Sequence, residues 1–415
     1  MLLQLRHLHT IAKRRLPIPT SRTIMSDPIH LEGTTLEGGG QLLRLATCLS
    51  ALTQTPIRIT NIRGNRSRGG GLKAQHLTSV QWLGQASNAR ISGMGLKSKE
   101  ITFTPSSIRT DVGLGGEVVI KQNTPGAVNL VFQAILPYLL FSGGEEKVRL
   151  RITGGTNVSN SPSCDYVEQV LLPILSLIGI PPIEAQVHSR GWSQGGTRLG
   201  SVTYTLTPLR KKLPAFQLTV RGEVESIKAT VIAPKDYEQQ IFDELDVMFE
   251  KRHTMFFGTR DPHIEMTFED SRHETRFYLL LVATTTTGVK LGRDWLYDRG
   301  ARAGKMDNVI ASLVRQVSLD LIAEIQHGGC VDEYLRDQLV VFQALAEGRS
   351  RVYGGKREGV EVQPSLHAET ANWVAKEVVG VDFDREGTCE GIGFAVGEEA
   401  EPELIEGMEE LKVST

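Results

Sequence analysis

The sequence predicts an α/β fold in which helices and small sheets pack in layers (α+β layered). Two observations lead to this prediction. Segments with apolar residues at helical spacing alternate with short segments in which apolar and polar residues alternate. A unit of glycine, helix, turn and strand also recurs along the chain. We therefore expect a large domain of repeated units, and a change of pattern near residues 207–292 indicates a smaller inserted α/β domain.

Three helix-and-strand pairs define the repeat. In the first, Leu42, Leu45 and Leu49 lie at helical spacing and Pro56 ends the helix before an alternating strand. The second pair follows Thr124-Pro125-Gly126, and the third is a poorer copy. The expected helices are 41–53, 127–141 and 334–347, the strands that follow them are 57–62, 148–152 and 351–353, and two further helices are 72–85 and 165–178.

The inserted domain is expected after a polar break at Lys211 and Lys212. It would hold strands 217–220, 227–232, 263–268 and 276–281 and one helix, 235–249. The alternative is that this segment is another repeat. The predicted division is a large domain of residues 27–206 plus 293–397, a small domain of residues 207–292, and two outer segments, 1–26 and 398–415.

The two outer segments differ in charge. Residues 1–26 are basic and lack acids, which is typical of a mitochondrial transit peptide, of a disordered basic tail, or of an upstream extension if translation starts at Met25. Residues 398–415 hold seven glutamates and one lysine, which predicts a solvated tail.

Composition limits the function further. The formal net charge of −2 means that a polyanion must bind at a local basic patch. The four cysteines are scattered, which argues against a zinc site and a disulfide framework. The longest apolar run, residues 170–183, has 14 residues and three prolines, so no membrane span is expected.

The segment 36–44 is the strongest candidate for a ligand site. Glu37 precedes three glycines that open directly onto the helix at residues 41–53. Free amides at a helix start suit a phosphate, and a carboxylate beside them suits Mg²⁺ or Mn²⁺. From these residues alone, a turn capped onto a core helix is the favoured alternative.

Residues 61–73 form a second candidate loop. They combine glycines with the cations Arg63, Arg66, Arg68 and Lys73. The planar guanidinium group of arginine can form paired hydrogen bonds with phosphate oxygens, so the loop is a candidate phosphate site. The alternative is a loop whose charges are only solvated. Glycine loops also occur at 154–157 and 195–197, but none of these loops has the spacing of a P-loop NTPase.

His367 is the candidate nucleophile. Ser365 is placed to cap a helix whose first turn would contain His367. The positive end of the helix dipole disfavours imidazolium, so the ring would be neutral, as a nucleophile must be. A single histidine is more often structural, and from these residues alone that alternative is favoured.

Taken together, these motifs resemble the RNA 3′-terminal phosphate cyclase family. The resemblance runs in order from about Leu31 to Gly393. It is carried by Glu37-Gly-Gly-Gly-Gln41-x-x-Arg44, the Arg63/Arg66 loop, Gln75-His76-Leu77, Gly154-Gly155-Thr156-Asn157, Tyr334-x-x-Asp337-Gln338 and Pro364-Ser365-x-His367. It implies a large domain of repeated helix and four-stranded-sheet units with a smaller inserted domain.

The resemblance also implies a reaction and its participants. The enzyme would be a nucleotidyl-transferring ligase that uses ATP and Mg²⁺ or Mn²⁺ to close the 3′-phosphate end of an RNA into a 2′,3′-cyclic phosphodiester. Covalent histidine–AMP and RNA(3′)pp(5′)A would be the intermediates. By position, the nucleophile is His367 and the metal ligand is Glu37. The ATP-binding side chains are Gln41, Arg44, Arg63, Arg66 and Gln75 at the phosphates and Gln133, Pro162, Tyr334, Asp337 and Gln338 at the adenosine.

Two departures and two alternatives accompany the resemblance. The loop at Gly69–Gly71 lacks the family's usual proline and is one residue longer, and Thr197 replaces a glycine. A non-catalytic, cyclase-like factor in ribosome biogenesis (pre-rRNA processing) is the alternative function, but the chain keeps both His367 and the Glu37–Gln41 motif. We expect a nuclear protein, or a mitochondrial one if residues 1–26 are a transit peptide.

Overall fold

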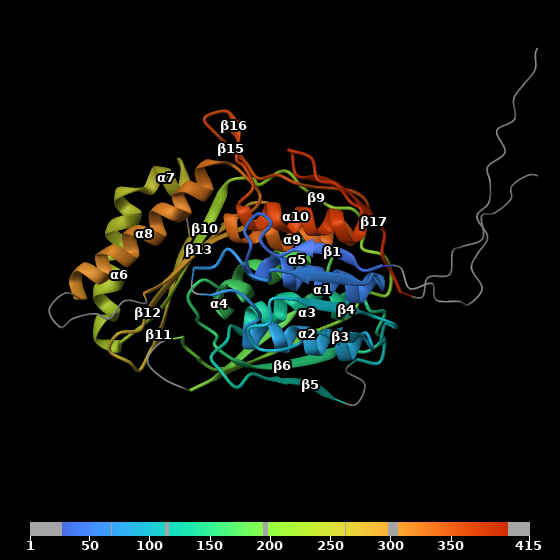
Figure 1. Ribbon diagram of the computed structural model, residues 1–415. Helices are drawn as coiled ribbons and strands as arrows, with labels where there is room; N and C mark the ends of the chain where they lie inside the picture. The colour runs from blue at the N-terminus through green and yellow to red at the C-terminus, as the bar shows by residue number, and fades with distance from the viewer. Residues whose placement is uncertain are drawn as a thin grey trace, which may run out of the picture.

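The computed structural model describes residues 27–67, 69–112, 116–193, 198–261, 263–297 and 306–396. The predicted outer segments 1–26 and 398–415 and the Thr197 departure lie outside these residues. The chain has an α/β fold, as predicted. Figure 1 shows a large body and, at its left, a smaller body in which helices cover one face of a tilted sheet.

The elements of the large body come from both ends of the described chain. Its helices are α1 (Gly40–Thr53), α2 (Ala74–Ala86), α3 (Val128–Phe141), α4 (Cys164–Tyr166), a π-helix (Val167–Leu171), α5 (Leu172–Leu177), α9 (Glu333–Leu345) and α10 (Leu366–Val379). Its strands are β1 (Ile29–Glu32), β2 (Ile57–Thr60), β3 (Arg90–Ser92), β4 (Ile101–Thr104), β5 (Glu117–Lys121), β6 (Val148–Gly154), β7 (Glu184–Ser189), β8 (Gly200–Leu206), β9 (Gln217–Leu218), β14 (Glu347–Val352), β15 (Lys356–Arg357), β16 (Val360–Glu361) and β17 (Thr388–Ile392).

The first two sheets of the large body have the same topology. Their strand orders are β1-β2-β4-β3 and β5-β6-β8-β7. In each, the first two strands are parallel and the other neighbours are antiparallel. A third sheet has the order β17-β14-β9. In it, β14 is parallel to β9 and antiparallel to β17, so it has one parallel and one antiparallel pair. These shared patterns confirm the repeated unit that the helix-and-strand periodicity predicts.

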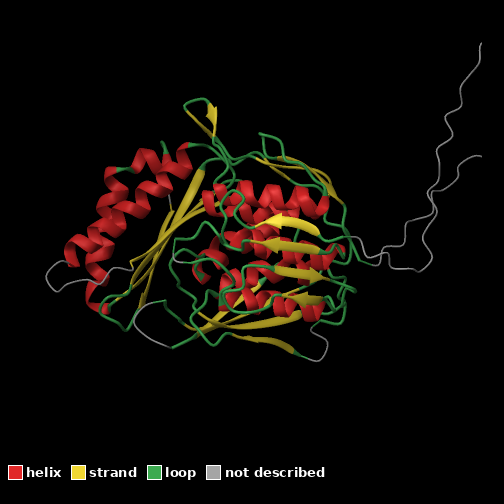
Figure 2. Cartoon of the chain, viewed as in Figure 1, coloured by secondary structure: helices red, strands yellow, loops and turns green. Residues whose placement is uncertain are grey.

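The helices of the repeats form the centre of the large body. Figure 2 shows them gathered inside, with the strands around them. Helix α1 packs against α2, α3 and α10, and α3 also packs against α9. The apolar spacing of α1 places Leu42, Leu45 and Leu49 in this core, all at most 9% exposed. Three helices from three repeats therefore meet at one place, which is where the candidate site lies.

The small body has later boundaries than the predicted 207–292. Its elements are β10 (Val224–Ala233), a 3-10 turn (Lys235–Tyr237), α6 (Glu238–Lys251), α7 (His253–Phe257), β11 (His263–Asp270), β12 (Phe277–Thr285), β13 (Lys290–Tyr297) and α8 (Met306–Gln326), with the sheet order β11-β10-β12-β13. Strand β9 instead pairs with β14 of the large body. Strand β13 pairs with β12 as far as Tyr297, and α8 packs on both strands. These pairings, which the local pattern did not indicate, set the boundaries.

An ion-pair network joins the two bodies. Arg190, just after β7, contacts Asp165 with both terminal nitrogens at 2.6 and 2.9 Å. It also contacts Glu269 on β11 at 2.7 Å. Nearby, Gly292 of β13 lies so close to Val170 that a Cβ there would be 2.6 Å from the valine side chain. Side chains from both bodies can therefore line one cavity.

None of the described helices has the length and apolar character required to cross a bilayer.

Candidate functional site

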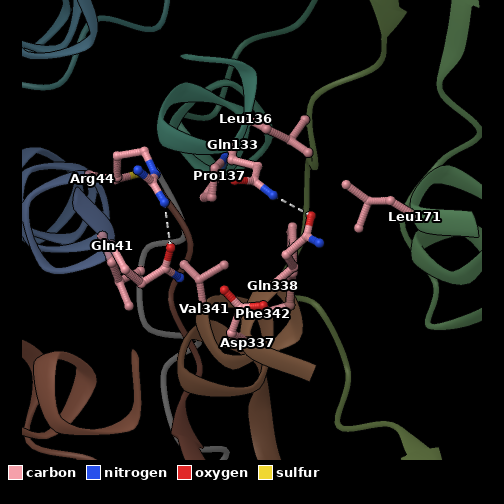
Figure 3. Close-up of a pocket in the computed structure, with 12 residues that line it drawn as sticks. Gln41, Arg44, Gln133, Leu136, Pro137, Leu171, Asp337, Gln338, Val341 and Phe342 are labelled. Carbon is pink, nitrogen blue, oxygen red and sulfur yellow. Dashed lines mark hydrogen bonds between the residues drawn. The ribbon is translucent and has the colours of Figure 1, made fainter. Parts of the chain in front are cut away.

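A cavity of about 400 Å³ lies where the large and small bodies meet. Helices α1, α3 and α9, the start of α10, the loop 157–163 and strands β12 and β13 all contribute to its lining. The predicted site residues in this lining are Gln41, Arg44, Gln133, Pro162, Tyr334, Asp337, Gln338 and His367. A smaller cavity of about 40 Å³ shares Gln41, Arg44, Gln133, Asp337 and Gln338 with it, and Figure 3 shows these side chains converging from α1, α3 and α9.

His367 lies in the first turn of α10. Ser365 is the N-cap, and its Oγ accepts a hydrogen bond from the backbone N–H of Ala368 at 3.3 Å, so the predicted cap is confirmed. The His367 side chain is 52% exposed, and its Nε2 lies 4.0 Å from Glu37 Oε1. The fold thus brings together two candidate residues that are far apart in the sequence.

The surroundings of His367 favour its neutral form. Partial burial and then the positive charges of Arg44 and Arg66 lower the pKa of His367 below its ordinary value, and Glu333 opposes them. Its ring is therefore mainly neutral at pH 7. A neutral imidazole at the edge of a polar cavity has a ring nitrogen available for nucleophilic attack.

Glu37 lies in the turn that leads into α1. Its backbone N–H donates to Thr370 Oγ1 at 3.2 Å, which fastens the turn to α10. Its side chain is 7% exposed and forms an ion pair with Arg66. Apart from this ion pair, neither carboxylate oxygen has a hydrogen-bond partner among the described residues. A Cβ at Gly39 would overlap this carboxylate, so the glycine makes room for it.

The start of α1 is electropositive. Its N-cap residue is Gly39, so no side chain at that position caps the first amides of the helix. Arg44 Nη2 donates to Gln41 Oε1 at 2.7 Å (Figure 3). Burial lowers the pKa of Arg44 to about 10, with Asp337 opposing the shift, so the guanidinium stays charged at pH 7. The helix dipole and Arg44 together favour an anion at this helix start.

His76 adds a neutral donor beside the same helix start. Burial and then the charges of Arg44, Arg63 and Lys73 lower the pKa of His76 to about 3. Its Nδ1 accepts the backbone N–H of Lys73 at 3.2 Å, so the ring proton is on Nε2. A Cβ at Gly40 would lie 2.7 Å from that Nε2. The glycine therefore lets this N–H group approach the first turn of α1.

Three predicted phosphate ligands, Arg63, Arg66 and Gln75, lie outside the cavity lining, and Arg66 is instead the ion-pair partner of Glu37. Arg63 is 8% exposed, and its Nη1 donates to the carbonyl of Gly71 at 3.2 Å. Gln75 Oε1 accepts the backbone N–H of Ala127, at the start of α3, at 3.2 Å. In this structure the Arg63 and Gln75 side chains brace the backbone around the site, and contact of all three residues with phosphate stays a prediction.

The opposite side of the cavity has the side chains predicted for adenosine. Gln133 Nε2 donates to Gln338 Oε1 at 2.6 Å (Figure 3), and Gln338 Nε2 donates to the carbonyl of Tyr334 at 2.6 Å. Burial raises the pKa of Asp337 to about 7, although Arg44 opposes the shift. Tyr334 is 39% exposed, so part of its aromatic ring is open to a planar ligand.

Glu37 is the side chain that fits a divalent cation. Its two buried oxygens, which have no hydrogen-bond partner apart from the ion pair with Arg66, are hard anionic ligands of the kind that Mg²⁺ and Mn²⁺ take. The described residues contain no group of three or more histidine, cysteine or acidic side chains that could hold a metal alone. A cation at Glu37 would therefore need oxygens from a bound phosphate, as in many magnesium sites.

The part of the lining that comes from the small body was not predicted from the sequence. Tyr278, Asp294, Trp295 and Leu296 belong to β12 and β13 and face the cavity. The predicted insert ended before Asp294, and no motif marked these residues. The only available signal was the aromatic and apolar stretch at 295–297, which would have extended the sheet prediction.

The fold and the site define an α/β protein of repeated helix-and-sheet units, with a neutral histidine, a buried carboxylate and basic side chains around one cavity. The sequence model of the RNA 3′-terminal phosphate cyclase family matches residues 35–385. The chain therefore belongs to this family.

Several relatives carry the same name as the family. The RNA 3′-terminal phosphate cyclase of Pyrococcus furiosus is 32% identical over 384 residues, which cover 91% of this chain and 98% of the relative. That of Desulfurococcus amylolyticus is 31% identical over 394 residues, which cover 88% of this chain and 99% of the relative. That of Drosophila melanogaster is 30% identical over 360 residues, which cover 86% of this chain and 92% of the relative.

Arg66→Gln is expected to raise the pKa of His367. Arg66 is one of the charges that disfavour the imidazolium, so its removal lets the ring take up a proton at a higher pH. The C2 proton resonance of His367, followed by NMR across a pH titration, measures this directly. Arg58→Gln is the matched control, because Arg58 is on β2 and pairs with Glu100. Equal His367 midpoints in both variants would contradict the prediction.

Proposed function

We propose that this protein uses ATP to convert the 3′-terminal phosphate of an RNA into a 2′,3′-cyclic phosphodiester. The observation that carries the proposal is the neutral His367, with Nε2 4.0 Å from the buried Glu37, at the edge of a cavity with positive charge at one side. Family membership and the names of the relatives support the same reaction.

In the first step, His367 attacks the α-phosphorus of ATP. A P–N bond forms, the bond to the bridging oxygen breaks, and pyrophosphate leaves. Arg44, Arg66 and the first amides of α1 are the donors that would hold the triphosphate. A divalent cation held by Glu37 and the phosphates would neutralise part of its negative charge.

In the second step, an oxygen of the RNA 3′-phosphate attacks the phosphorus of histidine–AMP. The P–N bond breaks, His367 is released as a neutral ring, and the end becomes RNA(3′)pp(5′)A. In the third step, the neighbouring 2′-hydroxyl attacks the 3′-phosphorus and loses its proton, and AMP leaves. Side chains of both bodies line the cavity in which these steps would take place.

The adenosine part of ATP would lie between α3 and α9. Tyr334 would stack on the base. Gln133, held by Gln338, and the carboxyl of Asp337 line the same side of the cavity and would supply polar contacts.

An RNA with a radioactive 3′-phosphate tests the proposal. With ATP and Mg²⁺ or Mn²⁺, we expect the label to become resistant to phosphatase and to stay on the RNA. Omitting ATP should prevent the change. A non-catalytic cyclase-like factor would leave the label open to phosphatase under all of these conditions, and that result would overturn the proposal.

A further inference from the structure

The ring of Tyr334 has a charged neighbour that comes from the small body. The guanidinium carbon of Arg293, on β13, lies 4.4 Å from the centroid of the Tyr334 ring. Tyr166 meets the same ring nearly perpendicularly, at 76° and 6.0 Å between centroids. Tyr334 is nevertheless 39% exposed and lines the cavity. Arg293 therefore covers one face of the ring, while part of the ring stays open to a ligand.

Arg293 is held firmly in this place. Its Nη1 donates to Glu324 Oε1 at 2.8 Å and to Glu333 Oε2 at 3.0 Å. Asp320 is 3.9 Å from Nη2, and the Arg293 side chain is 12% exposed. His327 Nε2 lies 2.6 Å from the second oxygen of Glu324, so that carboxylate is itself fixed. These contacts, from α8 and the start of α9, prevent the guanidinium from turning away from the ring.

We propose that Arg293 is a positioning residue for the nucleotide, acting through Tyr334 to strengthen stacking of the purine base of ATP. This inference rests on the proposed function. A cation over one face of an aromatic ring is attracted to it and restricts its rotation. The ring then presents its open surface to the base in one orientation, which lowers the entropy cost of stacking. Through Arg293, the small body thus helps to shape the base site, although Arg293 itself does not touch the ligand.

The test measures binding of two ligands to full-length protein carrying His367→Asn, so that ATP is not consumed. One ligand is ATP, and the other is inorganic tripolyphosphate, which has no base. In this background, Arg293→Met is expected to weaken ATP binding about fivefold, within the range of cation–π effects. Binding of tripolyphosphate is expected to stay the same. Isothermal titration calorimetry gives both dissociation constants, and thermal unfolding checks that the variant is folded.

Two further variants keep the test decisive. Arg276→Met removes another arginine that lies over an aromatic ring, 5.4 Å from the Trp192 centroid and outside the cavity lining, and should not weaken ATP binding. Arg293→Lys keeps the positive charge beside the three neighbouring acids. It should therefore recover part of the ATP affinity that Arg293→Met loses, even if Arg293→Met also disturbs those acids. Combined with Tyr334→Ala, Arg293→Met should cause no further loss, because it acts through that ring.

The outcomes separate this inference from the proposed function. If Tyr334→Ala leaves ATP binding unchanged, the proposed base site is wrong. If Tyr334→Ala weakens ATP binding but Arg293→Met does not, only the role of Arg293 is wrong. An equal loss of tripolyphosphate binding, or a loss that persists in the Tyr334→Ala background, would show that Arg293 acts on the fold as a whole and would also overturn the inference.

Discussion

His367→Asn is expected to abolish covalent attachment of AMP to the protein. The asparagine has no ring nitrogen to attack phosphorus, so the adduct formed with α-labelled ATP should fall by on the order of 10³-fold or more. The side chain is 52% exposed and makes no buried hydrogen bond, so the thermal unfolding midpoint and ATP binding should change little. Autoradiography of the denatured protein measures the adduct.

The variant has a second expected property that a general loss of structure would not produce. RNA that already carries the activated (3′)pp(5′)A end should still be closed, because attack by the 2′-hydroxyl does not require His367 as a nucleophile. His188→Asn is the matched control, since His188 is on β7 and its Nε2 bonds to Thr203 at 2.8 Å. An undiminished adduct in His367→Asn would place the nucleophile elsewhere in the chain.

Arg190→Met is expected to cause a large loss of stability. Asp165 is 6% exposed and pairs with both terminal nitrogens of Arg190, so the substitution leaves a buried carboxylate without its charge partner. Breaking a buried pair in this way costs about 3–5 kcal/mol. Urea unfolding followed by circular dichroism measures the difference. The same change should also loosen the small body, since Arg190 contacts Glu269 on β11.

Glu269→Gln is the control for this prediction. The Glu269 side chain is 46% exposed, and solvent screens its pairing with Arg190, so its loss should cost less than about 1 kcal/mol. Adding Asp165→Asn to Arg190→Met should recover part of the lost stability because the unpaired charge disappears. If Arg190→Met and Glu269→Gln are equally mild, the network contributes little to joining the two bodies.

The local features of this fold could be predicted because their causes are local. The leucine spacing and Pro56 predict a helix at residues 41–53, and the structure has α1 at Gly40–Thr53. Ser365 caps α10 as predicted, since a capping side chain acts within one helical turn. The repeat was visible for the same reason, because each copy carries its own helix and strand.

Features that depend on distant segments could not be predicted from such patterns. Strand β9 pairs with β14 and so belongs to the large body, although its sequence continues directly into the small one. The contact between Glu37 and His367 and the stacking of Arg293 on Tyr334 join segments that are far apart in the chain. Only the family resemblance placed Glu37 and His367 in one site, and nothing indicated Arg293.

His367 is proposed to carry AMP through a P–N bond. The most direct measurement is the chemical stability and position of the adduct that the wild-type protein forms with α-labelled ATP and a divalent cation. We expect a label that survives alkali, is lost in acid, and maps to the peptide that contains His367. A label that resists acid and is released by alkali, or one that maps to another peptide, would contradict it.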